Sequence, residues 1–147
     1  MQDNNITYKD VSPNNIFYEN GLFKLLPNEL IEHSTYQKLK IEEEVYPSPE
    51  LLIGLKLGEE NVDEEDILEK CNVFTFGMVM LEVTTLLPSQ ECYDLENYQI
   101  FDPVLKERVM MVSEYYGEKV ARVIANMLDY DFTERMNLKD LSIWINR

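Results

Sequence analysis

The sequence predicts a mainly α-helical domain with at most one short β-hairpin, near its N-terminus. Three features support this prediction: a long apolar run over residues 72–86, helical periodicity in the segments that follow it, and an Asn-Gly dipeptide between two short apolar runs near the start of the chain. A chain of 147 residues is long enough to bury a core of its own. We therefore treat residues 1–147 as a single domain.

The hairpin is expected over residues 16–26. Residues 16–18 and 22–26 are mostly apolar, and Glu19-Asn20-Gly21 lies between them. Glycine accepts the positive φ that a tight turn needs, so an Asn-Gly pair between apolar runs is a strong signal for a hairpin.

The central element is expected to be a buried helix over residues 72–86. Apolar side chains occur on nearly all of its sides, which is typical of a helix surrounded by the core rather than of an amphipathic surface helix. Pro88 ends the run, because proline cannot continue a helix. Cys71 lies at its start, where we expect a reduced, buried thiol.

Further helices are expected between residues 103 and 146. Asp102 and Pro103 predict a helix N-terminus, with the aspartate as the cap and the proline at the first helical position. Asn137 is expected to cap the last helix, with Asp140 near its third position. Apolar residues at helical spacing are Leu105, Val109 and Val112, then Val120, Val123, Ile124, Met127 and Leu128, and in the last helix Leu138, Leu141, Trp144 and Ile145.

The charge of the chain bears on its partners. A net charge of −15, from 28 acidic and 13 basic residues, argues against nucleic acid and anionic membrane surfaces as ligands. The acids concentrate at residues 42–44 and in an acidic insertion at residues 58–70. This insertion is either a docking surface for a basic partner or a solvated segment that keeps the protein soluble.

The sequence contains no evident targeting or membrane-spanning segment. Its first residues are polar, and no apolar run approaches the ~20 residues of a membrane span. The two cysteines are too few for a disulfide framework. The expected location is therefore the cytoplasm, which includes association with the cytoskeleton.

Several segments resemble, in order, motifs of the eukaryotic protein kinase superfamily. Residues 8–15, Tyr-Lys-Asp-Val-Ser-Pro-Asn-Asn, resemble the catalytic loop HRDLKPEN, and residues 48–50, Ser-Pro-Glu, stand in the place of APE. Residues 71–82 are similar to SDVFSFGxxLLE, the start of a long buried helix, and residues 128–135 resemble LxxDPxxR before the last helix. The degenerate DFG position falls on residues 27–29, Pro-Asn-Glu. The resemblance implies a truncated kinase-like C-lobe whose nucleotide-binding N-lobe is absent.

The resemblance implies catalytic roles that the sequence retains only in part. Asp10 matches the catalytic base of the family and Asn15 its second metal ligand. Pro27 stands in the place of the principal metal ligand and has no side-chain oxygen to replace it. Tyr8 and Ser12 replace the histidine and the lysine of the loop. We therefore expect no catalysis, no cofactor and no bound metal, with Asp10 and Asn15 as structural remnants of the kinase motifs.

The residues that hold a kinase C-lobe together are better retained than the catalytic ones. Glu50 and Arg135 match a buried ion pair that ties the activation segment to the end of the C-lobe in the family. Asn72 replaces an aspartate that anchors the catalytic loop, and its amide oxygen can accept the same hydrogen bonds less strongly. A retained fold with lost chemistry is the pattern of a pseudokinase.

Two functions agree with this pattern. In the first, a catalytically inactive kinase-like module acts as a protein-binding or structural subunit of a larger assembly. Other protein chains then cover apolar surface exposed along residues 73–84 and the catalytic-type loop. In the second, the chain is the C-lobe fragment of a larger protein kinase or pseudokinase with an ATP-dependent or regulatory role. We favour the first, because Pro27 removes the metal ligand whatever lies upstream.

Overall fold

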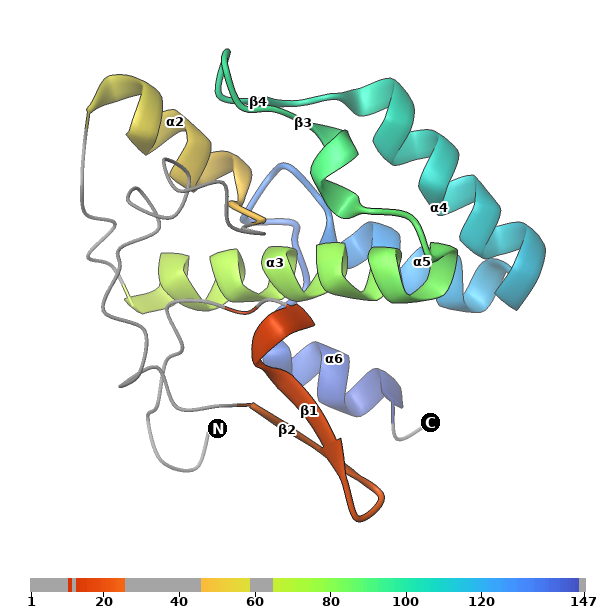
Figure 1. Ribbon diagram of the computed structural model, residues 1–147. Helices are drawn as coiled ribbons and strands as arrows, with labels where there is room; N and C mark the ends of the chain where they lie inside the picture. Colours follow the sequence, from red (N-terminus) through yellow and green to blue (C-terminus); the bar gives the residue numbers. More distant parts are fainter. Residues whose placement is uncertain (1–10, 12, 26–45, 59–64, 146–147) are drawn as a thin grey trace.

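In the described part of the chain, helices pack around one central helix, with two small hairpins at the periphery (Figure 1). The computed structural model describes residues 11, 13–25, 46–58 and 65–145. Its mainly helical architecture with small two-stranded sheets is the fold class that the sequence predicts. The helices are α2 (Pro49–Leu57), α3 (Glu65–Thr85), α4 (Asp102–Tyr116), α5 (Glu118–Met127) and α6 (Leu138–Ile145).

Helix α3 crosses the middle of the molecule, with α4 above it and α6 below it in the view of Figure 1. It begins at Glu65 rather than at residue 72, so the end of the predicted acidic insertion is helical. Two contacts with the C-terminal segment hold these extra turns: Glu69 accepts a hydrogen bond from the backbone N–H of Leu138, and Lys70 donates one to the carbonyl of Arg135. No helix in the described ranges, α3 included, is long and apolar enough to cross a membrane.

The first hairpin pairs β1 (Ile16–Glu19) with β2 (Leu22–Leu25) after the short 3-10 helix η2 (Pro13–Asn15). Asn20 and Gly21 form its two-residue turn with φ values of 52° and 82°, the left-handed geometry that such turns need. The predicted hairpin is thereby confirmed. Its base packs against the main core through Ile16 and Leu25, and its tip projects away from the helices (Figure 1).

The apolar stripes of α4, α5 and α6 form the core as their spacing predicts, except that the side chain of Ile145 lies outside the described part of the structure. Leu105, Val112, Val123, Ile124, Met127, Leu128 and Leu141 are buried, and Val109, Val120, Leu138 and Trp144 are partly buried against them. Cys71 is a free, buried thiol, also as predicted.

The starts of α4 and α6 test the predicted caps. Asp102 is the first residue of α4 and Phe101 takes the cap position, so the prediction for Asp102 is wrong. The Asp102 carboxylate instead accepts a hydrogen bond from the Tyr130 hydroxyl, a tertiary contact that sequence spacing does not reveal. At α6, Asn137 Oδ1 accepts a hydrogen bond from the backbone N–H of Asp140 at 2.8 Å, which confirms that cap.

A second hairpin contradicts the expectation of at most one. Strand β3 (Tyr93–Asp94) pairs with β4 (Gln99–Ile100), directly after the 3-10 helix η4 (Ser89–Cys92). Asp94 closes the turn by accepting hydrogen bonds from Asn97, at 3.2 Å from its backbone N and 2.7 Å from Nδ2. Strands of two residues carry no alternating pattern long enough to be detected in a sequence.

The apolar face expected along residues 73–84 is covered by the chain itself. In this stretch Val83 is exposed, while the other large apolar side chains are buried or half-buried. Helices α4 and α5, η4 and the base of the first hairpin supply the cover. The expectation of an open apolar face along α3 is therefore wrong, and the catalytic-type loop expected beside it lies largely outside the described residues.

Gly77 sets the distance between α3 and the end of α5. A Cβ at this position would lie 2.9 Å from Leu128 Cδ2 and 3.0 Å from Met127 Cβ. We expect Gly77→Ala to lower the free energy of unfolding by about 1 to 3 kcal/mol, although alanine favours a helix by about 1 kcal/mol over glycine. Urea denaturation followed by the fluorescence of Trp144, the sole tryptophan, measures the loss. In a Leu128→Ala background the loss should shrink, and an equal loss in both backgrounds would contradict the steric explanation.

Candidate functional site

The structure brings Glu50 and Arg135 together. Glu50 lies in the first turn of α2, and Arg135 lies in the loop between α5 and α6. Arg135 Nη2 is 2.7 Å from Glu50 Oε1, and Nη1 is 3.1 Å from Oε2, so the guanidinium binds the carboxylate through two parallel hydrogen bonds. Such bidentate pairs combine charge with fixed geometry. The pair therefore joins α2 to the C-terminal part of the chain.

Further bonds complete the surroundings of Arg135, whose side chain is fully buried. Its Nε donates to the carbonyl of Asp129 at 2.7 Å, and Nη1 also donates to the carbonyl of Lys70 at 3.0 Å. The guanidinium carbon lies 5.0 Å from the centre of the Phe74 ring, within the range of a cation–π contact. A buried charge is tolerated only when it is paired and hydrogen-bonded, and Arg135 meets both conditions.

Cys71 lies beside this pair but has no reactive character. Its Sγ donates a weak hydrogen bond to Glu50 Oε2 at 3.8 Å. Burial raises the pKa of the Cys71 thiol to about 11. A thiol with such a pKa stays protonated at neutral pH, whereas the nucleophilic and metal-binding form is the thiolate.

Ser48 is the exception in this well-bonded region. It is fully buried at the cap position of α2, yet its hydroxyl caps nothing and has no hydrogen-bond partner. The Ser48 hydroxyl lowers the pKa of the Cys71 thiol, although burial raises that pKa by more. The hydroxyl oxygen and the Cys71 sulfur do not meet the geometry of a hydrogen bond. An unsatisfied buried hydroxyl costs stability.

A second network fastens residues 46–48 to α3. The Tyr46 hydroxyl donates to Glu82 Oε2 at 2.6 Å, and the backbone N–H of Ser89 donates to the same oxygen at 2.7 Å. The Thr75 hydroxyl donates to the carbonyl of Tyr46 at 2.9 Å. Tyr93 stacks on Tyr46 with a ring-centre distance of 6.4 Å and donates its hydroxyl to the carbonyl of Pro47 at 3.0 Å.

The sequence gives no signal for this network. Tyr46 and Glu82 are separated by 36 residues, and neither residue type is unusual in its position. Glu82 does belong to the segment that resembles the kinase helix motif, but that likeness assigns it no partner.

The structure describes only some of the remaining predicted site residues. Asn15 is buried at the end of η2, and Asn72 is half-buried on α3 next to Cys71. Asp10 and the segment at residues 27–29 lie outside the described residues, as do most of the loop residues that Asn72 is expected to anchor. The structure therefore does not test the relation between Asp10, Asn15 and the position of Pro27.

The described part of this site is suited to holding segments together. Its carboxylate, guanidinium and hydroxyl groups are mostly bonded to one another, and the thiol is protonated. Within residues 11, 13–25, 46–58 and 65–145, no group of three or more His, Cys, Asp or Glu side chains is arranged to hold a metal ion. The chemistry that these residues support is the tethering of α2, α3 and the loop between α5 and α6.

Removing the buried arginine should destabilise the domain strongly. We expect Arg135→Ala to lower the free energy of unfolding by about 3 to 5 kcal/mol, because it leaves the Glu50 carboxylate without its counter-charge. Arg122→Ala is the matched control: Arg122 and Glu118 form an exposed i,i+4 pair at 3.7 Å, and such pairs contribute about 0.5 kcal/mol or less. Urea denaturation compares the two variants, and equal losses would contradict the structural role of Arg135.

Removing the unsatisfied hydroxyl should have the opposite effect. We expect Ser48→Ala to raise the free energy of unfolding by about 1 kcal/mol, because no hydrogen bond is lost. Ser89 provides the comparison, since it is equally buried but its hydroxyl donates to the carbonyl of Met78 at 2.8 Å. Ser89→Ala should therefore lower the free energy of unfolding by about 1 kcal/mol. Thermal melts of both variants measure the two signs, and a loss of stability in Ser48→Ala would refute the assignment.

The sequence of the chain matches a known family. A family model described as protein tyrosine and serine/threonine kinase matches residues 1–144. No curated protein and no solved structure matches the chain. The matched range includes the loop at residues 8–15, all of α6 but its last residue, and both partners of the buried Glu50–Arg135 pair. The chain belongs to the protein tyrosine and serine/threonine kinase family.

Proposed function

We propose that the chain is a catalytically inactive member of this family that acts by binding other proteins, as a structural or scaffolding subunit of a larger assembly. Inactivity is supported by the sequence, because Pro27 stands where the family has its principal metal ligand and offers no side-chain oxygen. Ser12 in place of the loop lysine also removes a positive charge that would face the transferred phosphate.

The observation that carries the binding role is the first hairpin, which exposes apolar side chains on both faces. On one face, Tyr18 and Phe23 are 68% and 76% exposed, and their ring centres are 5.0 Å apart. On the other face, Phe17 and Leu22 are exposed. Adjacent apolar side chains left open to water are typical of a surface that another protein covers.

The charges of the hairpin agree with this role. Glu19 and Lys24 form an ion pair on the same face as Phe17 and Leu22, so the hairpin adds no net charge to an acidic chain. A partner surface that covers it is therefore apolar and needs no charge of its own at the contact.

The same hairpin supports one alternative. If the chain is a fragment of a larger kinase or pseudokinase, upstream residues of the same polypeptide cover the hairpin, and the function is then regulatory or ATP-dependent. Asp10 and Asn15, which match a catalytic base and a metal ligand, favour this reading. In the first proposal another protein covers the hairpin, and in the second proposal upstream residues of the same polypeptide cover it.

Native purification of the endogenous protein separates them. We expect a polypeptide near 17.4 kDa held in a larger complex, and we expect Phe23→Ser to release it from that complex because a polar residue then replaces the most exposed ring of the hairpin. Leu86→Ser is the matched control, since Leu86 is also highly exposed but lies after α3. Intact mass and native size are the readouts.

Three results would contradict the proposal. A much longer polypeptide that runs alone would favour the fragment, and transfer of phosphate from ATP and Mg²⁺ by the purified chain would exclude inactivity. Equal release by Phe23→Ser and Leu86→Ser would remove the hairpin as the contact.

A further inference from the structure

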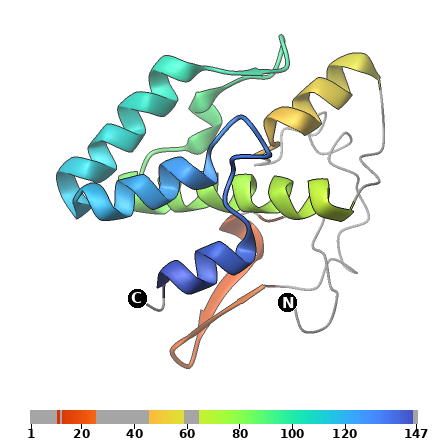
Figure 2. The same cartoon turned by 180° about the vertical axis from the view of Figure 1, so that it is seen from behind.

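A second exposed surface lies at the opposite side of the molecule from the first hairpin. It is formed by the β3–β4 hairpin, the start of α4 and the loop at residues 129–134. The Tyr130 hydroxyl donates to Asp102, which ties this loop to α4, and Arg135 ties the end of the loop to α2. Figure 2 shows the loop in front, between α2 and the β3–β4 hairpin. We call this surface the acidic–aromatic face.

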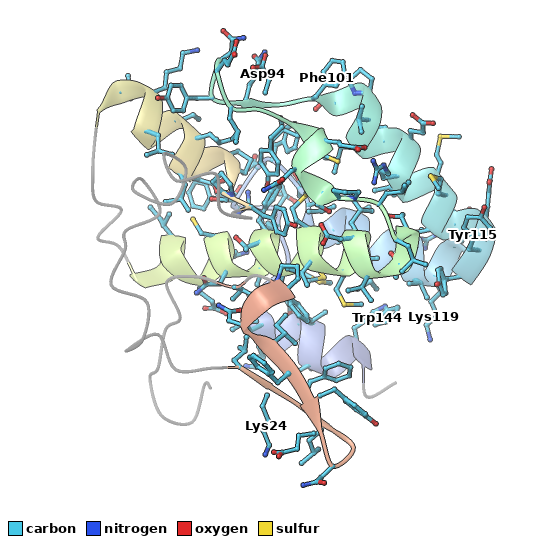
Figure 3. All side chains as sticks on the ribbon, viewed as in Figure 1. Lys24, Asp94, Phe101, Tyr115, Lys119 and Trp144 are labelled. Atoms are coloured by element: carbon cyan, nitrogen blue, oxygen red, sulfur yellow. The ribbon has the colours of Figure 1, made fainter. Side chains whose placement is uncertain are left out.

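Apolar side chains are open to solvent on this face. Phe101 is 52% exposed, and Tyr130 and Phe132 are about as exposed, at 42% and 40%. Figure 3 shows Phe101 at the same edge as Asp94, whereas Tyr115 lies at the far end of α4. Partly exposed rings held by a folded loop offer flat surfaces on which another planar group can stack.

The three segments that form this face also carry carboxylates. They are Asp94, Glu96, Asp102, Asp129, Asp131 and Glu134, all exposed or half-exposed. Lys106 pairs with Asp102 at 3.1 Å, and no other lysine or arginine of the described residues forms an ion pair with these six carboxylates. The face therefore carries a negative charge that its own side chains do not neutralise.

Local hydrogen bonds fix several of these carboxylates. Asp131 accepts bonds from the hydroxyl and backbone N–H of Thr133 at 2.6 and 2.9 Å, and Asp94 accepts one from Gln99 at 3.2 Å in addition to those from Asn97. The bonds to Thr133 lower the pKa of Asp131, and those to Asn97 lower the pKa of Asp94. Both groups are therefore charged at neutral pH, and because their positions are already fixed, these side chains lose little conformational entropy when a ligand binds.

We propose that the acidic–aromatic face binds a basic peptide segment of another protein that carries apolar side chains. Arginine fits best, because its planar guanidinium can stack on Phe101 or Phe132 while it binds a neighbouring carboxylate. A second copy of this chain is a poor occupant, since each copy carries a net charge of −15. The inference rests on the proposed protein-binding role and names the chemistry of one partner.

The purified chain and labelled peptides test this directly. The probe is fluorescein-labelled (Arg-Leu)₄, with (Arg-Ser)₄ and (Glu-Leu)₄ as comparison peptides, and fluorescence anisotropy at about 0.15 M salt is the readout. We expect (Arg-Leu)₄ to bind, (Arg-Ser)₄ to bind at least about tenfold more weakly, and (Glu-Leu)₄ not to bind. Absence of (Arg-Leu)₄ binding would overturn the proposal.

Matched variants locate the binding. Phe101→Ser with Phe132→Ser should weaken binding about tenfold or more, whereas Tyr115→Ser with Tyr116→Ser, at the other end of α4, should change it less than about twofold. Glu96→Gln with Glu134→Gln should weaken it severalfold, whereas Glu114→Gln with Glu118→Gln, which change the net charge equally, should not.

The controls also separate this inference from the proposed function. Equal losses in the two glutamine pairs would mean diffuse attraction to an acidic protein and would overturn the inference. Phe23→Ser on the first hairpin should leave the affinity for the peptide unchanged. The anisotropy measurement can therefore fail while the hairpin result stands, and the reverse also holds.

Discussion

A fully buried guanidinium must be neutralised and have its donors occupied, and Arg135 meets these needs with groups from three segments: Glu50 at the start of α2, the carbonyl of Lys70 on α3, and the carbonyl of Asp129 in its own loop. None of these groups is close to another in the sequence. Together they surround the charge, so α2, the first turns of α3 and the loop before α6 are joined at one point.

The polar contacts of residues 46–48 extend this junction along α3. Tyr46 and Thr75 bind at the middle of the helix, and Glu82 and Ser89 bind near its end. The buried polar groups of the chain thus hold segments of the backbone in place.

The exposed aromatic side chains lie on two different surfaces. Those of the first hairpin have little charge around them, whereas those of the acidic–aromatic face occur together with carboxylates. The described part of the chain therefore carries two chemically distinct exposed surfaces.

Local signals in the sequence predict much of this fold, because the turn at Asn20-Gly21 and the spacing of Val123, Ile124 and Met127 depend on neighbouring residues alone. The pairing of Glu50 with Arg135 could be anticipated only through the resemblance to kinases. The pairing of Tyr46 with Glu82 could not be anticipated, because its partners meet through tertiary packing. The start of α3 at Glu65 cannot be predicted locally for the same reason, because the hydrogen-bond partners of Glu69 and Lys70 lie in the last third of the chain.

The position of Cys71 gives this domain a built-in chemical reporter. Its thiol lies against Glu50, inside the junction, and burial keeps it protonated. An alkylating reagent can therefore modify it only when the junction separates and water enters. The rate at which the thiol is labelled under native conditions would then measure how often this junction opens, without any introduced probe.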